Sequence, residues 1–236
     1  IKRTENRQKV IAEGDFLAGE MTGCLKRYWG YEEFRPWQEE TILSVLNNRD
    51  SLTVLPTGGG KSLCFQLPAL LREGTAVVIS PLISLMKDQV DSLKEMGIAA
   101  EYLNSSQSAG EQRSVIERVR RGEVKLLYIS PERLQGDWTL SLLKSIEVSF
   151  FVIDEAHCIS HWGHDFREDY RNLSIIKEEF KGIATHAFTA TATKEVQRDI
   201  LGQLHLDNPL INIASVDRTN LTYRIEMRSE VIQQIT

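Results

Sequence analysis

The chain of 236 residues is long enough to bury the core of one large α/β domain, alone or with an appended arm. Its formal net charge of −5 argues against a broad basic surface for nucleic acid, so any such contact has to be local. No apolar run approaches the roughly twenty residues of a membrane span, and no signal peptide is recognisable, so we expect an intracellular protein without a membrane partner.

The three cysteines, Cys24, Cys64 and Cys158, are scattered and form no Cys-x-x-Cys pair. We expect buried, reduced thiols and no zinc site. The chain begins with Ile1 rather than Met, which is typical of a fragment, although a processed or disordered start would look the same.

The predicted elements begin with a polar arm or loose helix over residues 1–22. A short helix follows at Cys24–Tyr28 and a second at Pro36–Leu46, and from there strand-like and helix-like patterns alternate. Strands are expected at Leu52–Leu55, Ala76–Ser80, Ala99–Leu103 (a weaker pattern), Leu126–Ser130, Phe150–Ile153, Ala184–Thr189 and Leu210–Ala214. Helices are expected at residues 61–72, 83–96, 109–121, 137–145, 168–180 and 193–203.

The expected strands are almost continuously apolar rather than alternating, which is the pattern of a parallel sheet covered by helices on both faces. Together with the alternation of strands and helices, this predicts a doubly wound, mainly parallel α/β domain. We assign the domain to residues 23–214 and expect residues 215–236 to leave it.

Directly after the first strand, a run of small residues leads into Lys61 and Ser62. Small residues let backbone N–H groups turn inward around a phosphate, and a helix starting near Gly60 would add its N-terminal partial charge. Lys61 would supply a positive charge to the β- and γ-phosphates of ATP, and the Ser62 hydroxyl would ligate Mg²⁺. The strict pattern has a glycine where this chain has Leu55, so a flexible turn is the alternative. The predicted phosphate loop is Thr57, Gly58, Gly59, Gly60, Lys61 and Ser62.

An acidic pair, Asp154 and Glu155, follows the apolar run Val148–Ile153. Asp154 at the end of a buried strand can hold Mg²⁺, and Glu155 can orient or deprotonate an attacking water. Taken alone, such a pair is also common surface chemistry. Doubly wound sheets bind ligands at the carboxyl ends of their strands, where both motifs fall, and this joint placement favours nucleotide hydrolysis.

Further motifs surround these two and extend over most of the chain. They are Phe34–Glu40, Ser80–Val90, Ser130–Leu134, Asp154–Ser160, Trp162–Arg167 and Thr189–Thr193. In this order the set resembles the first RecA-like lobe of a RecQ-family DNA helicase, a superfamily 2 motor, over roughly residues 24–225. An RNA helicase of the DEAD-box or DEAH-box type would share the phosphate loop and the acidic pair but would lack the aromatic loop Trp162–Arg167.

The resemblance implies an ATP-dependent helicase that moves 3′ to 5′ and unwinds DNA in repair or recombination. It also implies that Gln38 reads the adenine edge, because its amide offers one donor side and one acceptor side. Tyr31 and Arg35 would pack a ring and a guanidinium around the base. A polar helix start with solvated side chains is the alternative for all three residues.

Aromatic and basic side chains gather within the loop between Cys158 and Tyr170. Trp162, Phe166 and Arg167 suit stacking on unpaired bases and contact with phosphates. In the family that the chain resembles, this loop couples DNA binding to hydrolysis. The alternative is that the two aromatic rings plug the core. The neighbouring histidines show no spacing that is typical of metal ligands.

Two further segments are candidates for contacts with DNA or for coupling. Ser80, Lys87 and Gln89 lie where a helix opens after a strand, so backbone N–H groups and a lysine could contact a DNA phosphate, although a solvated helix start explains Lys87 nearly as well. Thr189 and Thr191 end a later strand. They could bond the acidic pair and report the γ-phosphate state to the DNA side, or they could cap the next helix.

The resemblance implies a second RecA-like lobe that carries an arginine finger, usually followed by a zinc module and a winged-helix domain. Residues 215–236 resemble the crossover toward that lobe, and the isolated first lobe would hydrolyse ATP very slowly. Two other functions remain open: a nucleic-acid-stimulated translocase that does not unwind, and a nucleotide-dependent binding module without turnover. The location would be cytoplasmic in a bacterium and nuclear in a eukaryote.

Overall fold

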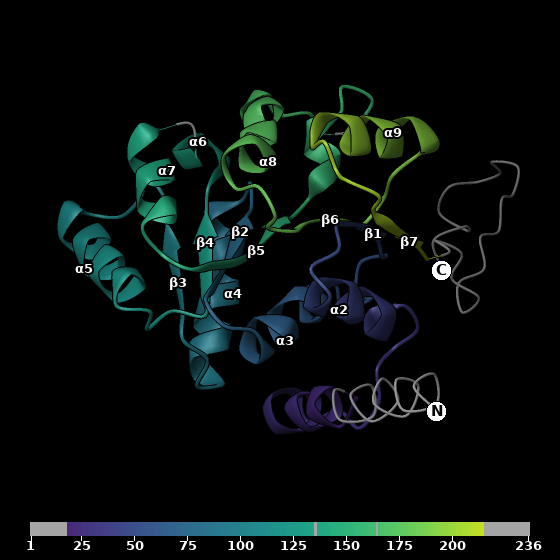
Figure 1. The fold of residues 1–236 in the computed structure, drawn as a ribbon, viewed down its shortest axis with the longest axis horizontal. Helices are drawn as coiled ribbons and strands as arrows, with labels where there is room; N and C mark the ends of the chain where they lie inside the picture. Colours follow the sequence, from purple (N-terminus) through teal and green to yellow (C-terminus); the bar gives the residue numbers. More distant parts are fainter. Residues whose placement is uncertain (1–17, 135, 164, 215–236) are drawn as a thin grey trace, which may run out of the picture.

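The computed structural model describes residues 18–134, 136–163 and 165–214 (Figure 1). Within these residues seven strands form one sheet in the order β3-β4-β2-β5-β6-β1-β7, and every neighbouring pair is parallel. The doubly wound α/β class is confirmed, and each predicted strand is present with bounds that differ by two residues at most. The strands are β1 (Ser51–Val54), β2 (Thr75–Ile79), β3 (Ala100–Leu103), β4 (Leu126–Ile129), β5 (Val148–Ile153), β6 (Thr185–Thr189) and β7 (Leu210–Ile213).

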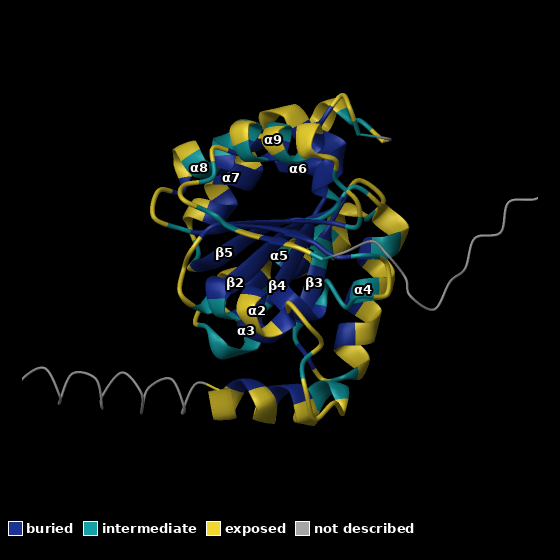
Figure 2. Ribbon diagram, turned by 90° about the vertical axis from the view of Figure 1, so that its right-hand side faces the viewer, coloured by how far each residue is buried: buried dark blue, intermediate teal, exposed yellow. Residues whose placement is uncertain are grey.

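Helices cover both faces of the sheet (Figure 2). A helix over residues 18–29 and the helices α2, α3 and α4 pack on one face, and α5 to α9 pack on the other. Two 3₁₀ segments cover Ala156–Ile159 and Glu168–Ser174. The α-helices are α2 (Gln38–Leu46), α3 (Leu63–Leu71), α4 (Ile83–Glu95), α5 (Ala109–Arg120), α6 (Pro131–Leu134), α7 (Asp137–Lys144), α8 (Ile175–Glu179) and α9 (Lys194–Gln203).

Each face of the sheet buries its own apolar core, because successive side chains of a strand point to opposite faces. Along β2, Val77 and Ile79 join the core beneath α5 to α9, whereas Ala76 and Val78 join the core beneath α2 to α4. The strands β1, β2, β4, β5 and β6 are buried along their whole length. The continuous apolar pattern that predicted a parallel sheet therefore follows from burial on both faces.

Residues 168–180 differ from the single helix that was predicted for them. They form the 3₁₀ segment Glu168–Ser174 and then the short helix α8. The buried side chains Tyr170, Leu173 and Ile176 recur every third residue. A 3₁₀ helix has about three residues per turn, so it holds such a stripe on one face better than an α-helix does. The 3₁₀ segment Ala156–Ile159 and α6 have no counterpart among the predicted elements.

The helix over residues 18–29 is longer than the predicted segment Cys24–Tyr28 and runs through the expected boundary after residue 22. Met21 and Leu25, about one turn apart, are both buried in the core that α2 and α3 also line. Most of the predicted arm (residues 1–17) and the predicted crossover (residues 215–236) lie outside the described residues. Among the helices of the described part, none combines the length and the apolar character needed to cross a bilayer.

The strand order gathers the motifs found in the sequence at one edge of the sheet. β2, β5, β6 and β1 are consecutive neighbours in the middle of the sheet, and all four run in the same direction. Their carboxyl ends lead into Ser80, Asp154, Thr189 and the phosphate loop. In a doubly wound sheet this edge is where ligands bind.

Candidate functional site

A cavity of about 610 Å³ opens at the carboxyl ends of β1 and β5. This volume lies within the range of roughly 300–1,000 Å³ that is typical of small-molecule sites. Its wall brings together the phosphate loop, the acidic pair and the three residues predicted to surround adenine. The predicted residues that line it are Tyr31, Arg35, Gln38, Thr57, Gly58, Gly60, Lys61, Ser62, Asp154 and Glu155.

The backbone of the phosphate loop requires its glycines. Gly58 and Gly60 have φ angles of 82° and 77°, a region that side chains with a Cβ rarely adopt. A Cβ on Gly59 would lie 2.8 Å from the carbonyl oxygen of Pro56, to which the Gly59 amide also donates a hydrogen bond. The loop is therefore a specific conformation rather than a flexible turn.

Gln38, the first residue of α2, makes hydrogen bonds to the phosphate loop. The side chain is buried, its Oε1 accepts a hydrogen bond from the Arg35 amide at 2.8 Å, and its Nε2 lies 3.3 Å from the carbonyl oxygens of Gly59 and Gly60. The Arg35 guanidinium donates to the carbonyl of Gly58. Two of the three predicted adenine contacts, Gln38 and Arg35, therefore bind the loop in this arrangement, while Tyr31 remains exposed on the cavity wall.

The side chain of Lys61 points toward the end of β1, where the phosphate loop begins. Its ammonium group donates to the carbonyl oxygen of Leu55 at 3.3 Å, at the end of β1. Lys61 and Asp154 both line the cavity. A phosphate bound in this cavity would therefore lie within the same pocket as the lysine and the carboxylate.

The acidic pair follows β5 through a strained turn. The Asp154 amide donates to the Ile79 carbonyl at 2.8 Å, its Oδ1 accepts from the Glu155 amide at 3.0 Å, and its backbone carbonyl accepts from the Tyr170 hydroxyl at 3.0 Å. Glu155 has φ 47° and ψ 45°, a left-handed conformation that costs a non-glycine residue of order 1–3 kcal/mol. Strain of this kind clusters at functional sites, where it aims a side chain.

The residues present fit Mg²⁺. Burial, and then the neighbouring charge of Glu155, raise the pKa of Asp154 to about 6. The Asp154 carboxylate and the Ser62 hydroxyl, both lining the cavity, are the hard oxygen donors that Mg²⁺ prefers, and a bound cation would relieve the repulsion between the two carboxylates.

His157, which the sequence analysis did not single out, connects the acidic pair to β6. Its Nδ1 lies 2.9 Å from Thr189 Oγ1 and 3.2 Å from Glu155 Oε2. Thr189 also donates to the carbonyl of Thr191 at 3.1 Å. The predicted contact between the threonines and the acidic pair therefore passes through this histidine. The cap of α9 is a different residue, Thr193.

The aromatic loop leaves its tryptophan in solvent. Trp162 is 76% exposed, so it does not plug the core. Phe166 is half-buried and stacks on the ring of His161 with 3.8 Å between centroids. The Arg171 guanidinium lies 5.5 Å from the centroid of the Phe166 ring. His164, in the same loop, lies outside the described residues.

Arg167 ties the aromatic loop to the segment after β2. It donates to the Pro81 carbonyl at 3.0 Å and pairs with Asp165 at 3.1 Å. Lys87 is exposed on α4, as a contact with a phosphate requires. Ser80 is buried, and its amide is bonded to the Ile129 carbonyl, so the direct DNA contact predicted for Ser80 does not fit this geometry.

We expect Asp154→Asn to raise the stability of the nucleotide-free chain at pH 7. The pKa of Asp154 is raised from 3.8 to about 6, so the ionised carboxylate is less favourable in the folded than in the unfolded chain, by at most about 3 kcal/mol. This penalty is complete above the pKa that Asp154 has in the folded chain. It fades as the pH falls toward the pKa of Asp154 in the unfolded chain. The gain should therefore be largest near neutral pH and vanish near about pH 4.

Denaturant unfolding at both pH values measures this effect. Asp91→Asn, at an exposed position of α4, is the matched control and should change the unfolding free energy by less than about 0.5 kcal/mol. An Asp154→Asn chain that is less stable than the wild type at pH 7 would show that the surroundings favour the charged carboxylate.

Taken together, the parallel doubly wound sheet, the glycine-dependent phosphate loop and the acidic pair at neighbouring strand ends define a P-loop nucleotide-binding domain of the RecA-like class. The model of the family described as DEAD/DEAH box helicase matches residues 35–199. The chain belongs to this family, and its relatives place it among the RecQ-type members.

Three relatives illustrate the similarity. The ATP-dependent DNA helicase RecQ of Haemophilus influenzae is 48% identical over 212 residues, which are 90% of this chain and 34% of that protein. The protein of the same name from Bacillus subtilis is 49% identical over 203 residues, 85% of this chain and 34% of that protein. The ATP-dependent DNA helicase hus2/rqh1 of Schizosaccharomyces pombe is 41% identical over 227 residues, 92% of this chain and 17% of that protein. The chain thus spans about a third of the length of the bacterial RecQ proteins.

Solved structures with lower identity share the fold. The Hef helicase domain of Pyrococcus furiosus matches with a TM-score of 0.57 and 20% identity, over 76% of this chain and 38% of that one. The DEAD-box helicase Mss116, bound to single-stranded RNA and UDP-BeF, matches with a TM-score of 0.64 and 20% identity, over 84% of this chain and 43% of that one. These matches bear on the RecA-like architecture alone.

Proposed function

We propose that this chain is the first motor lobe of a RecQ-type DNA helicase, which hydrolyses ATP to move 3′ to 5′ and to unwind DNA in repair or recombination. The observation that carries the proposal is the continuous link between the nucleotide cavity and an exposed aromatic loop. Glu155 contacts His157, which contacts Thr189, and the same turn leads directly into Trp162. The RecQ relatives are named ATP-dependent DNA helicases, which supports ATP and DNA as the two ligands.

In the nucleotide site each residue has a defined task. Bound ATP brings the γ-phosphoryl group, and Mg²⁺ neutralises its charge. Ser62 and Asp154 would hold the metal ion. Lys61 would exchange the Leu55 carbonyl for the β- and γ-phosphates, and Glu155 would orient the attacking water and accept its proton.

Gln38 links recognition of the base to the shape of the phosphate loop. Its amide now bonds to the Gly59 and Gly60 carbonyls, so reading an adenine edge requires Nε2 to leave them. Tyr31, exposed on the cavity wall, would pack against the base, and Arg35 would release the Gly58 carbonyl. Adenine recognition would thereby free the loop for the phosphates.

On the DNA side, Trp162 and Phe166 would stack on unpaired bases, and Arg167 and Lys87 would contact phosphates. Arg167 already joins the loop to Pro81, so DNA that engages the loop would also act on the segment between β2 and α4. Thr189 and Thr191 would pass the state of the γ-phosphate to the same region through His157.

A second RecA-like lobe would complete the motor. An arginine finger is worth about 10³–10⁵ in rate in related nucleotide hydrolases. In this proposal that residue comes from the second lobe, across the open side of the cavity.

The proposed coupling role is tested by Trp162→Ala in the full-length protein. Loss of one base stack should cost about 1–3 kcal/mol of affinity for single-stranded DNA, about 5- to 150-fold, and should weaken the stimulation of ATP hydrolysis by DNA. Fold stability should change little, because the side chain is 76% exposed. Fluorescence anisotropy with a labelled single strand and a coupled ATPase assay measure the two effects.

Trp138→Ala is the matched control, since Trp138 is a 46% exposed tryptophan on α7, outside the aromatic loop. It should leave both DNA affinity and stimulation unchanged. If DNA still stimulated ATP hydrolysis normally in Trp162→Ala, the coupling role proposed for Trp162 would be wrong. Strand-separation assays on the wild-type protein distinguish a helicase from a translocase that does not unwind, and DNA binding without any turnover would indicate a nucleotide-dependent binding module.

A further inference from the structure

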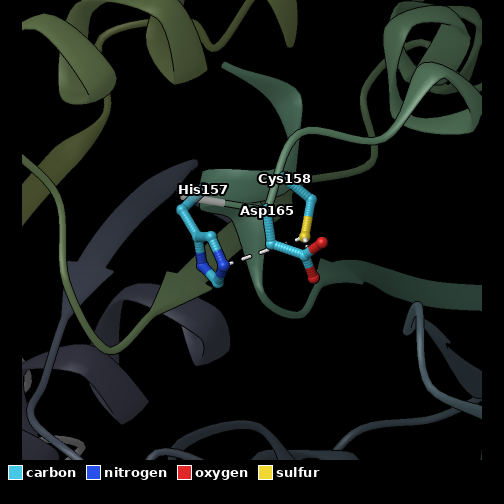
Figure 3. Close-up of side chains that lie close together, drawn as sticks. All are labelled: His157, Cys158 and Asp165. Atoms are coloured by element: carbon cyan, nitrogen blue, oxygen red, sulfur yellow. Dashed lines mark hydrogen bonds between the residues drawn. The ribbon is translucent and has the colours of Figure 1, made fainter. Parts of the chain in front are cut away.

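Three potential metal ligands of different chemistry meet beside the nucleotide cavity (Figure 3). They are the imidazole of His157, the thiol of Cys158 and the carboxylate of Asp165. His157 Nε2 lies 3.8 Å from Cys158 Sγ, which in turn lies 4.0 Å from Asp165 Oδ2, and the three donor atoms are within 4.8 Å of one another. Two of these residues follow the acidic pair, and the third belongs to the aromatic loop.

The distance between the imidazole and the thiol is close to that in a tetrahedral metal centre. Bonds of about 2.1 Å from zinc to nitrogen and about 2.3 Å from zinc to sulfur place the two ligand atoms about 3.6 Å apart. The 3.8 Å between the imidazole and the thiol needs only a slight contraction. The side chain of Asp165 is 50% exposed, so it has room to move toward the other two and leaves an entry path for the ion from solvent.

The surroundings of His157 also suit a metal ligand. Histidines that ligate metals characteristically use the second ring nitrogen for a hydrogen bond to a carboxylate or another acceptor, which fixes the orientation of the ring. Here Nδ1 faces Thr189 Oγ1 at 2.9 Å and Glu155 Oε2 at 3.2 Å, so Nε2 is turned toward the sulfur of Cys158.

We propose that His157, Cys158 and Asp165 bind a thiophilic divalent ion of the Zn²⁺ class, with water in the fourth position. A thiolate and an imidazole favour Zn²⁺ over Mg²⁺, so this site is chemically distinct from the oxygen donors of Ser62 and Asp154. The proposal goes beyond the helicase function, because it needs neither nucleotide nor DNA.

A bound ion would fasten the aromatic loop to the turn after the acidic pair. It would take Asp165 Oδ2, which Arg167 now contacts from Nη2 at 3.1 Å and from Nε at 3.3 Å. Arg167 would keep its contact with the Pro81 carbonyl. Metal occupancy would thus hold the loop in one position relative to His157 and Glu155.

Titration of the chain with Co²⁺ tests the site, in the presence of excess Mg²⁺ and a non-thiol reductant and without nucleotide or DNA. A thiolate ligand gives Co²⁺ a sulfur-to-metal charge-transfer band in the near ultraviolet, which an oxygen-only site lacks. We expect this band to saturate at one ion per chain and to disappear when Zn²⁺ is added. A wild-type chain that shows no such band would overturn the proposal.

Three variants test whether the sulfur-to-metal charge-transfer band comes from the proposed ligands. Cys158→Ser should abolish it, whereas Cys24→Ser, which alters a buried cysteine in the first helix, should retain it. Asp165→Asn changes an exposed side chain and so leaves folding intact; it should weaken Zn²⁺ binding about tenfold or more in competition with Co²⁺. If circular dichroism shows that Cys158→Ser does not fold, Asp165→Asn decides. A band that survives in folded Cys158→Ser, or wild-type affinity in Asp165→Asn, would place the ion elsewhere.

Discussion

Lys61→Ala is expected to weaken ATP binding by about 2–5 kcal/mol, about 30- to several-thousand-fold. Lys61 is the lysine that lines the cavity, and its ammonium group already lies at the end of β1, 3.3 Å from the Leu55 carbonyl. Arg35 on the same wall is proposed to pack against the base, so it does not substitute for the lost charge at the phosphates. Isothermal titration calorimetry with Mg²⁺ and a non-hydrolysable ATP analogue measures the loss.

The control for this experiment is Lys87→Ala, which makes the same change of charge on an exposed face of α4. It should leave nucleotide affinity unchanged in the absence of DNA. Equal affinity of Lys61→Ala and the wild type would contradict the assignment of residues 57–62 as a phosphate loop.

Glu155→Gln should separate binding from chemistry. The variant keeps the shape of the side chain but loses the base, so we expect nucleotide affinity to persist while DNA-stimulated hydrolysis in the full-length protein falls about 10²- to 10⁴-fold. The contact with His157 loses its charge as well, which should weaken the response to DNA. Steady-state turnover at saturating ATP, with nucleotide affinity measured in parallel, resolves the two effects.

Glu33→Gln is the matched control, because Glu33 lines the same cavity but lies outside the acidic pair. Its turnover should stay close to that of the wild type. Retained hydrolysis in Glu155→Gln would show that another residue acts as the base. If nucleotide affinity fell as much as turnover, Glu155 would act in binding rather than in the chemical step.

The sheet and the position of the site could be predicted because both depend on local patterns. Continuous apolar runs identified strands that are buried on both faces, and the residues directly after two of those strands carried the phosphate loop and the acidic pair. Parallel strands end at a common edge, so the meeting of Lys61 and Asp154 around one cavity followed from chain order and strand direction.

Contacts between distant segments could not be predicted in this way. Gln38 was assigned to adenine by the family resemblance, and this assignment stays a prediction. The hydrogen bonds from the same amide to the phosphate-loop carbonyls could not be predicted, because they depend on how α2 packs beside the loop. His157 lies in a motif that drew attention to its acidic members. Asp165 lies near His157 and Cys158 because the loop folds back on itself. The spacing of these three residues in the sequence matches no recognised metal-ligand pattern, so their proximity could not be predicted.

The left-handed backbone at Glu155 affects which substitutions this lobe can accept during evolution. Glycine adopts such φ and ψ angles without a steric penalty and asparagine tolerates them, so the fold alone would favour either residue at position 155. The role in hydrolysis that is proposed for Glu155 would oppose that preference. In a lineage that kept the lobe merely to sense nucleotide, substitution at this position would relieve strain and remove turnover in one step. Under the role proposed for Glu155, a substitution that removes catalysis would also relieve the backbone strain at this position.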